Sequence, residues 1–206
     1  MIAGCGVAAQ LTVGEESSYA TPAASYARGL EFVSESLALQ HDVLQDQNIG
    51  AGDYYPLGAR RRLYRRAAAG QIQLEVAPRN FGLLFKHMLG GTPTNTNLSG
   101  TPAAYLQTHT PGPLAGHSLT IQKGVPLSDG SALRPFTAVG CKVAGWQLDF
   151  LMARPVLLGL QIDACDLRDA TNPAGGQITT LATPTWASTP TVPYSLEVAG
   201  RNRTAR

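Results

Sequence analysis

The chain has 206 residues, of which 44% are hydrophobic and 15% are charged, and its formal net charge is +2. This length suits one large β domain or two small ones, and the 22 glycines and 14 prolines favour many strands and turns over long solvated helices. No window holds the roughly 18 apolar residues of a membrane helix, so neither a membrane span nor a membrane partner is predicted.

The N-terminal part is predicted to form short strands. Residues 1–13 have no basic group before their mild apolar run, so we expect them to belong to the mature protein rather than to a signal peptide. Residues 10–22 open with an alternating segment and then become polar. Residues 27–40 have the alternation of a strand, and a helix over residues 37–44 fits the pattern as well.

Residues 41–69 show no clean hydrophobic period. A connection of this length in a compact domain is usually functional or disordered, so we predict a long inter-strand loop here. The segment RRRLYRR within it holds a cluster of five arginines: Arg60, Arg61, Arg62, Arg65 and Arg66. Outside this cluster, 11 basic and 14 acidic residues leave a mildly acidic body.

Three interpretations of the arginine cluster remain open. Clustered arginines with a tyrosine between them suit nucleic-acid phosphates and bases. The same cluster on a long loop suits docking on an acidic surface of another subunit. The third interpretation is a solvated charged loop without a partner.

The most informative stretch is residues 70–91, GQIQLEVAPRNFGLLFKHMLGG, in which the hydrophobic period changes from two to about 3.6. Its first part predicts a half-buried strand whose polar face carries Gln71, Gln73 and Glu75. Pro78 ends that pattern, and a short helix over residues 79–89 is predicted to follow and to stop at a Gly-Gly pair. The residues predicted to anchor this helix in the core are Phe81, Leu84, Phe85 and Met88.

Beyond a polar loop, TPTNTNLSGTP, three further alternating runs predict strands around residues 118–122, 139–150 and 158–163. In the second run the apolar residues stand at odd positions up to Val143 and at even positions from Trp146 onwards. Such a change of face near Ala144 and Gly145 predicts a β-bulge. The chain is then rich in Thr, Pro, Ala and Gly up to Pro193 and shows no internal repeat.

No catalytic, cofactor or metal site is predicted. The sequence contains no P-loop, no GxGxxG after a strand, no HExxH and no GxSxG. His109 and His117 flank a Pro-Gly turn without a third ligand beside them, so we expect both to bond to backbone. The acidic run Asp163, Asp166 and Asp169 lacks the glycine and the glutamate of an EF-hand.

The cysteines also predict no metal and no disulfide framework. They occur without a CxxC pair and without histidines at zinc spacing: Cys5, Cys141 and Cys165. Cys141 and Cys165 lie in apolar, strand-like runs, so buried and reduced thiols are expected.

Five stretches, in this order, resemble the tail tube (major tail) proteins of long, non-contractile bacteriophage tails. They cover roughly residues 10–165 and are VGEESSYATP, LEFVSESL, QIQLEVAPRNFGLLFKHMLGG, YLQTHTPGPLAGHSLTIQKG and PFTAVGCKVAGWQLDF. The resemblance implies a single, mainly β domain, an antiparallel β-sandwich or barrel with one flanking helix. It also implies that six subunits join their inner sheets into a ring and that rings stack into a hollow tube through which the genome leaves.

The resemblance assigns roles to particular segments. Residues 41–69 match by position the loop that reaches the adjacent ring, so the five arginines are expected at inter-ring or subunit contacts. Residues 1–26 would be an N-terminal arm. Relatives continue past this chain's length, so residues 172–206 would be a C-terminal arm or incomplete final strands. The polar face with Gln71, Gln73 and Glu75 would line the lumen.

The expected function is therefore a structural virion protein of the tail, without catalysis or cofactor, assembled in the host cytoplasm. Its partners would be other copies of itself and the tape measure, tail terminator and tail-tip proteins, with DNA only as transient cargo. A channel for DNA should not be basic, and the mildly acidic body suits that requirement. The alternatives are a carbohydrate- or receptor-binding β-sandwich and an enzyme with a dispersed site. The long arginine loop favours the tube subunit over the binding module.

Overall fold

The computed structural model describes residues 8–26, 28–45, 61–76, 81–100, 103–127, 132–152, 154–169 and 182–183. Arg60 and most of the expected C-terminal arm, residues 172–206, lie outside the described residues. The described part of the chain contains no helix that is long and apolar enough to span a membrane.

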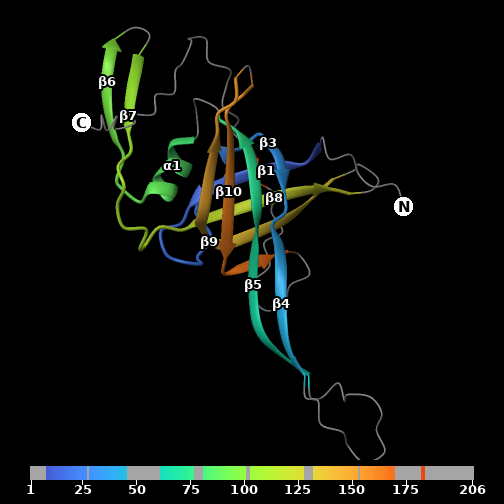
Figure 1. Ribbon diagram of the computed structural model, residues 1–206. Helices are drawn as coiled ribbons and strands as arrows, with labels where there is room; N and C mark the ends of the chain where they lie inside the picture. The colour runs from blue at the N-terminus through green and yellow to red at the C-terminus, as the bar shows by residue number, and fades with distance from the viewer. Residues whose placement is uncertain are drawn as a thin grey trace, which may run out of the picture.

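The fold is mainly β with one short helix, as predicted (Figure 1). In chain order the elements are β1 (Gln10–Glu15), β2 (Arg28–Gly29), β3 (Phe32–Glu35), β4 (Ala38–Gln45), β5 (Arg61–Glu75), α1 (Phe81–Leu89), β6 (Thr94–Gly100), β7 (Ala103–Thr108), β8 (Leu119–Pro126), β9 (Leu133–Asp149), β10 (Leu157–Ala164) and β11 (Asp166–Arg168). Every described strand pair is antiparallel, which confirms the predicted fold class.

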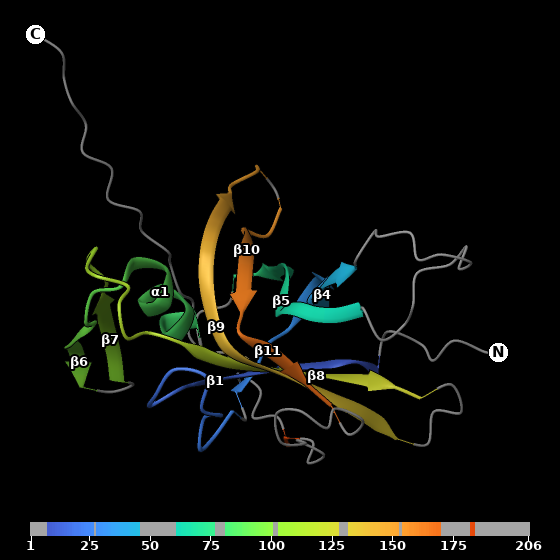
Figure 2. The same cartoon turned by 90° about the horizontal axis from the view of Figure 1, so that it is seen from below.

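One curved sheet forms the body. Its strands follow the order β2-β1-β8-β9-β10-β5-β3, with β11 paired to β9 and β4 paired to β5, while β6 and β7 form a separate hairpin. The long strand β9 joins the two halves of the sheet, because its first part pairs with β8 and its second part pairs with β10 (Figure 2). The register between β9 and β10 shifts so that Ala144 has no partner, which places a bulge where the parity slip predicted it.

The core lies between the two halves of the sheet and the helix. Alternate residues of β5 and β10 point inward, and their side chains are almost completely buried: Ile72, Leu74, Leu158, Leu160 and Ile162. Helix α1 contributes Phe81, Leu84 and Met88 to the same core, whereas Phe85 is half-buried. The helix ends at Gly90, whose φ of 81° is a left-handed conformation that glycine adopts without strain.

The excursion between β3 and the helix differs from the prediction of a loop over residues 41–69. Residues 41–45 belong to β4 and residues 61–69 belong to β5, and the two strands pair from Ala38–Ala69 out to Gln45–Arg61. They form an arm that projects from the body (Figure 1). No alternation marks these strands in the sequence, because the outer part of the arm buries neither face and is held by cross-strand pairing instead.

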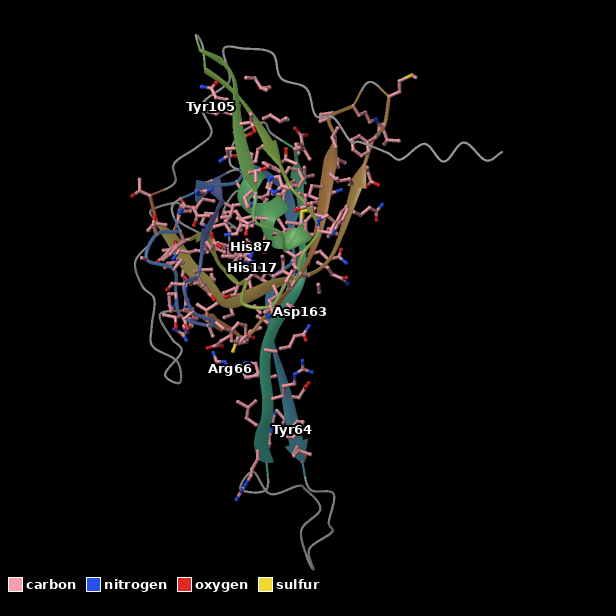
Figure 3. All side chains as sticks on the ribbon, turned by 90° about the vertical axis from the view of Figure 1, so that its left-hand side faces the viewer. Tyr64, Arg66, His87, Tyr105, His117 and Asp163 are labelled. Atoms are coloured by element: carbon pink, nitrogen blue, oxygen red, sulfur yellow. The ribbon has the colours of Figure 1, made fainter. Side chains whose placement is uncertain are left out.

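The predicted polar loop TPTNTNLSGTP is also partly strand, because its residues 94–100 form β6 and pair with β7. This hairpin lies at the end of the molecule opposite to the β4–β5 arm (Figures 1 and 3). The side chains that the structure describes in this hairpin are exposed, including Leu98, Tyr105 and Leu106, so it too lacks a hydrophobic period that would reveal a strand.

A buried carboxylate fixes the segment that follows β1. Glu16 is only 5% exposed, and its two oxygens accept four hydrogen bonds. Oε2 accepts from the N–H of Ala20 at 3.0 Å and from the hydroxyl of Ser118 at 2.7 Å. Oε1 accepts from the N–H of Gly140 at 2.8 Å and from the hydroxyl of Thr120 at 2.9 Å. This carboxylate therefore joins three separate segments of the chain at one point.

Candidate functional site

The β4–β5 arm exposes both of its faces. Residues 40–45 and 61–65 are all exposed, and the register places Val43 opposite Leu63 and Leu44 opposite Arg62. Tyr64, which lies at a register shift, is 73% exposed. A two-stranded hairpin in water is only marginally stable alone, and neighbouring exposed apolar side chains mark an interaction surface. The arm therefore has the composition of a contact surface.

The arginines of the cluster occupy different positions along the arm. Arg61, Arg62 and Arg65 are exposed, and Arg65 faces Asp42 across the strands. Arg66 lies at the base of the arm, inward of Tyr64 (Figure 3). The cluster is thus divided between exposed cations on the arm and one cation at its junction with the body.

Arg66 forms contacts within the chain. Its Nε lies 2.7 Å from Asp166 Oδ1, and its Nη2 donates a 3.3 Å hydrogen bond to the carbonyl of Leu167. These contacts attach the arm to β11, so Arg66 serves the fold of this subunit.

The acidic run near the end of β10 is explained by ion pairs rather than by a cation loop. The carboxylate of Asp166 forms an ion pair with Arg66, and its Oδ2 lies 3.8 Å from Arg168 Nε. The Oδ2 atom of Asp169 lies 3.4 Å from Arg134 Nη2. Asp163 is exposed on β10. Two of the three carboxylates are thus held by guanidinium groups.

The polar face predicted on β5 continues across the sheet. Gln71, Gln73 and Glu75 are exposed or half-buried, whereas Ile72 and Leu74 on the other face are buried. Cross-strand partners share a face, so the register extends this face through β10 to β9. The partners that it adds are Gln161, Gly159 and Leu157 on β10 and Gly145, Gln147 and Asp149 on β9. Most of these residues are glutamine, glycine or carboxylate, and the next position along the face pairs Asp163 with the exposed Lys142.

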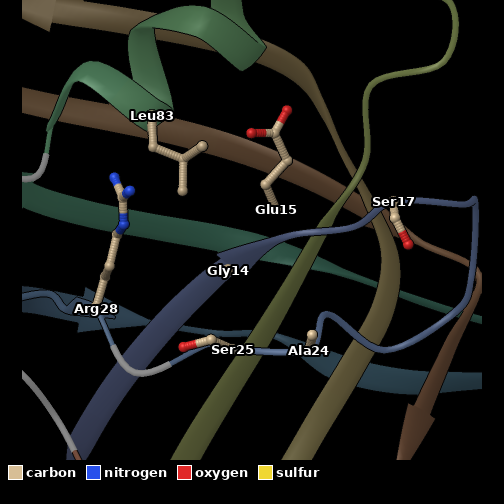
Figure 4. Close-up of a pocket in the computed structure, with 7 residues that line it drawn as sticks. All are labelled: Gly14, Glu15, Ser17, Ala24, Ser25, Arg28 and Leu83. Atoms are coloured by element: carbon tan, nitrogen blue, oxygen red, sulfur yellow. The ribbon is translucent and has the colours of Figure 1, made fainter.

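A pocket of about 350 Å³ opens beside the end of β1, and no motif in the sequence indicates it. Figure 4 shows its lining, which is Gly14, Glu15, Ser17, Ala24, Ser25, Arg28 and Leu83. Among the described residues, this lining contains two serines and the carboxylate of Glu15 but no histidine or cysteine.

Glu15 links this pocket to helix α1. Its Oε1 lies 2.6 Å from Lys86 Nζ and 3.5 Å from His87 Nε2. Desolvation alone would raise the pKa of Glu15, but the hydrogen bond and charge of Lys86 hold that pKa below its ordinary value. Burial lowers the pKa of His87 to about 4, so its imidazole is neutral at pH 7. The rings of His87 and His117 stack edge to face with centroids 5.4 Å apart.

Sequence reasoning did not find this group of side chains. It grouped His117 with His109, but His109 packs on Phe85 with ring centroids 5.7 Å apart, while His117 meets His87. The three residues come from separate parts of the chain, and the antiparallel pairing of β1 with β8 places Glu15 next to the start of β8. Only the knowledge of that pairing could have revealed the group.

Comparisons with known proteins place the chain in a family. The family model for phage tail tube proteins matches residues 6–201. No curated protein matches the sequence. Similar solved structures include a chain of the baseplate of the anti-feeding prophage, with 11% identity over 78% of this chain and 90% of that chain and a TM-score of 0.49. The SPP1 tail tube has 8% identity over 79% of this chain and 76% of that chain, with a TM-score of 0.47. Hcp1 from Flavobacterium johnsoniae has 10% identity over 83% and 99% of the two chains, with a TM-score of 0.38.

The family assignment rests on the family model, which spans nearly the whole chain. It confirms the resemblance stated from the five sequence stretches, and it agrees with the antiparallel fold. This protein therefore belongs to the family of phage tail tube proteins and is a structural component of a phage tail.

Proposed function

We propose that the protein assembles into rings of six subunits, that the rings stack through the β4–β5 arm into the tube of a long, non-contractile tail, and that DNA passes through the lumen. The observation that carries this proposal is the arm itself. It extends from the body and exposes arginines together with Leu44, Leu63 and Tyr64. A ribbon of this composition gains stability when a partner covers it.

The polar face of β5, β10 and β9 suits the wall of a channel for DNA. Each cation that neutralises a phosphate releases counterions and strengthens DNA binding, so a wall of arginines would hold the genome. Between β5 and β9 the polar residues paired with Gln71, Gln73 and Glu75 are uncharged or acidic, whereas Arg61, Arg62 and Arg65 are exposed on the arm. This separation of charges supports a lumen that does not bind its cargo.

The tip of the β9–β10 hairpin supplies a candidate contact within the ring. Trp146, Phe150 and Leu151 are each about half exposed near this tip. Such a group of large apolar side chains marks an interaction site, and joining sheets into a closed barrel would also cover the sheet edges. The neighbouring subunit of the same ring is the partner that we assign to it.

The remaining partners follow from the family. The ends of the tube would contact the tape measure, tail terminator and tail-tip proteins, DNA would be transient cargo, and assembly would take place in the host cytoplasm. No catalytic step is assigned to this protein.

The test compares two double substitutions. Arg61→Ser with Arg62→Ser removes two arm cations that have no acidic partner across the strands. Arg28→Ser with Lys142→Ser removes two exposed cations from the body as the control. Single exposed ion pairs contribute only about 0–1 kcal/mol, but the loss repeats at every subunit contact.

We expect the arm variant to remain folded and to sediment less in a pelleting assay for tubes, and high salt should partly reproduce its defect in the wild type. The control should pellet normally. If the arm variant forms normal tubes but loses affinity for DNA and shows a flatter salt dependence, the cluster is a DNA-binding element and this role of the arm is wrong.

A further inference from the structure

Three side chains with metal-binding atoms meet at one point of the fold. Glu15 ends β1, His87 lies on the buried side of α1, and His117 precedes β8. Figure 3 labels His87, which lies on the helix, next to His117, and their ring centroids are 5.4 Å apart. One carboxylate oxygen and one nitrogen from each imidazole lie within 4.8 Å of one another. This group, Glu15, His87 and His117, is separate from the arm and from the polar face.

The spacing within the group suits a small metal ion. A tetrahedral zinc site with bonds of about 2.0–2.1 Å has its ligand atoms roughly 3.4 Å apart. The distance from His87 Nε2 to Glu15 Oε1 is 3.5 Å. Any wider gap in the group therefore involves His117, which lies half-buried outside any strand and can turn about its side-chain bonds.

A second observation points to a ligand at the same place. His87 is only 3% exposed, and its Nε2 lies 3.5 Å from Glu15 Oε1, which is longer than the roughly 2.7–3.2 Å of an ordinary hydrogen bond and leaves the nitrogen poorly satisfied. A buried polar atom without a partner is costly, and native proteins leave few of them. This nitrogen lies 3.5 Å from Glu15 Oε1, so an ion bound between the two atoms would give its lone pair a partner.

We propose that Glu15, His87 and His117 bind a divalent transition metal ion, with Zn²⁺ as the first candidate. Two imidazole nitrogens and one carboxylate oxygen are ligands that zinc prefers, and they leave a fourth position for water. The metal would tie together the end of β1, the helix and the segment before β8. Its role would be structural, since it would hold the helix on the sheet of each subunit.

Lys86 provides a distinguishing feature of this site. Its ammonium lies 2.6 Å from the same Glu15 oxygen that faces His87, so it neutralises the carboxylate that the metal would use. The metal and the lysine therefore compete for Glu15 Oε1. Removing the ammonium should leave the metal affinity at least as high as in the wild type, whereas removing a ligand should reduce it.

The experiment titrates Zn²⁺ alone into metal-free, full-length protein and follows the heat of binding and the melting temperature. We expect saturable binding of one ion per chain and a rise in Tm, because an ion that binds only the folded state stabilises it. Glu15→Gln and His117→Ala should each weaken binding by at least about 100-fold, since even indirect partners of a metal cost 10- to 100-fold. Lys86→Met should bind at least as tightly as the wild type.

His41→Ala is the matched control, because His41 is an exposed histidine on β4 far along the chain from this group. Its binding should equal that of the wild type. Circular dichroism establishes that each variant is folded before its affinity is compared. Absence of saturable binding by the wild type, binding that survives both Glu15→Gln and His117→Ala, or loss of binding in Lys86→Met or His41→Ala would overturn the proposal.

Discussion

Replacing the buried Glu16 by alanine should be one of the most damaging single changes in this chain. The substitution removes the acceptor of four hydrogen bonds. The hydroxyls of Ser118 and Thr120 can rotate towards other acceptors. The backbone N–H groups of Ala20 and Gly140 cannot, because the surrounding backbone fixes their direction.

The size of the effect follows from these two stranded donors. A buried donor that loses its partner costs about 1–3 kcal/mol, so Glu16→Ala should lower the free energy of unfolding by roughly 2–6 kcal/mol. That loss is a large part of the roughly 5–15 kcal/mol that stabilises a typical domain. The segment after β1 should lose its order first, since Glu16 is its attachment to Gly140 and to the start of β8.

Glu16→Gln tests the reasoning more sharply. Each carboxylate oxygen accepts one backbone N–H, Oε2 from Ala20 and Oε1 from Gly140. Whichever way the amide of glutamine is oriented, its NH₂ group therefore faces one of these N–H donors. The cost should be about 1–3 kcal/mol, between those of the wild type and alanine. Urea denaturation of dilute, unassembled protein measures both values. If both variants unfold within 0.5 kcal/mol (about the scatter of surface substitutions) of the wild type, Glu16 does not hold this region together.

Two further substitutions test the helix and the polar face. Leu84 is 1% exposed, so Leu84→Asp would bury an unpaired charge and should cost several kcal/mol, about 3–5; a soluble variant with unchanged melting would contradict the packing of α1. Gln73→Arg adds a cation to the exposed face, so subunits should fold and assemble normally while the phage particles eject DNA less well. Loss of folding in Gln73→Arg would instead show that this face is buried in the assembly or that its assignment is wrong.

The sequence was most informative where burial imposes a period. The strand with Ile72 and Leu74 and the helix that follows it were predicted because each buries one face, and because proline and glycine mark their ends. The bulge at Ala144 was predicted for the same reason, since the buried parity of β9 changes there. The buried face of the helix is wider than its apolar residues alone indicated, since it also includes His87.

Strands without a buried face were not predictable in this way. The outer arm of β4 and β5 and the β6–β7 hairpin expose nearly all of their described side chains, so nothing in their sequences alternates. Contacts between residues far apart in the sequence could not be predicted from hydrophobic periodicity either. The pairing of Arg66 with Asp166 and the meeting of Glu15 with His87 and His117 depend on which strands are neighbours, and a local period carries no such information.

Helical reconstruction of the assembled protein by electron cryomicroscopy would reveal both the contact between stacked rings and the residues that line the lumen. We expect stacked rings of six subunits, with the β4–β5 arm in contact with the adjacent ring and with Gln71, Gln73 and Glu75 facing the lumen. A protein that stays monomeric at high concentration, or a tube in which the arm leaves the adjacent ring untouched and arginines line the lumen, would contradict this expectation.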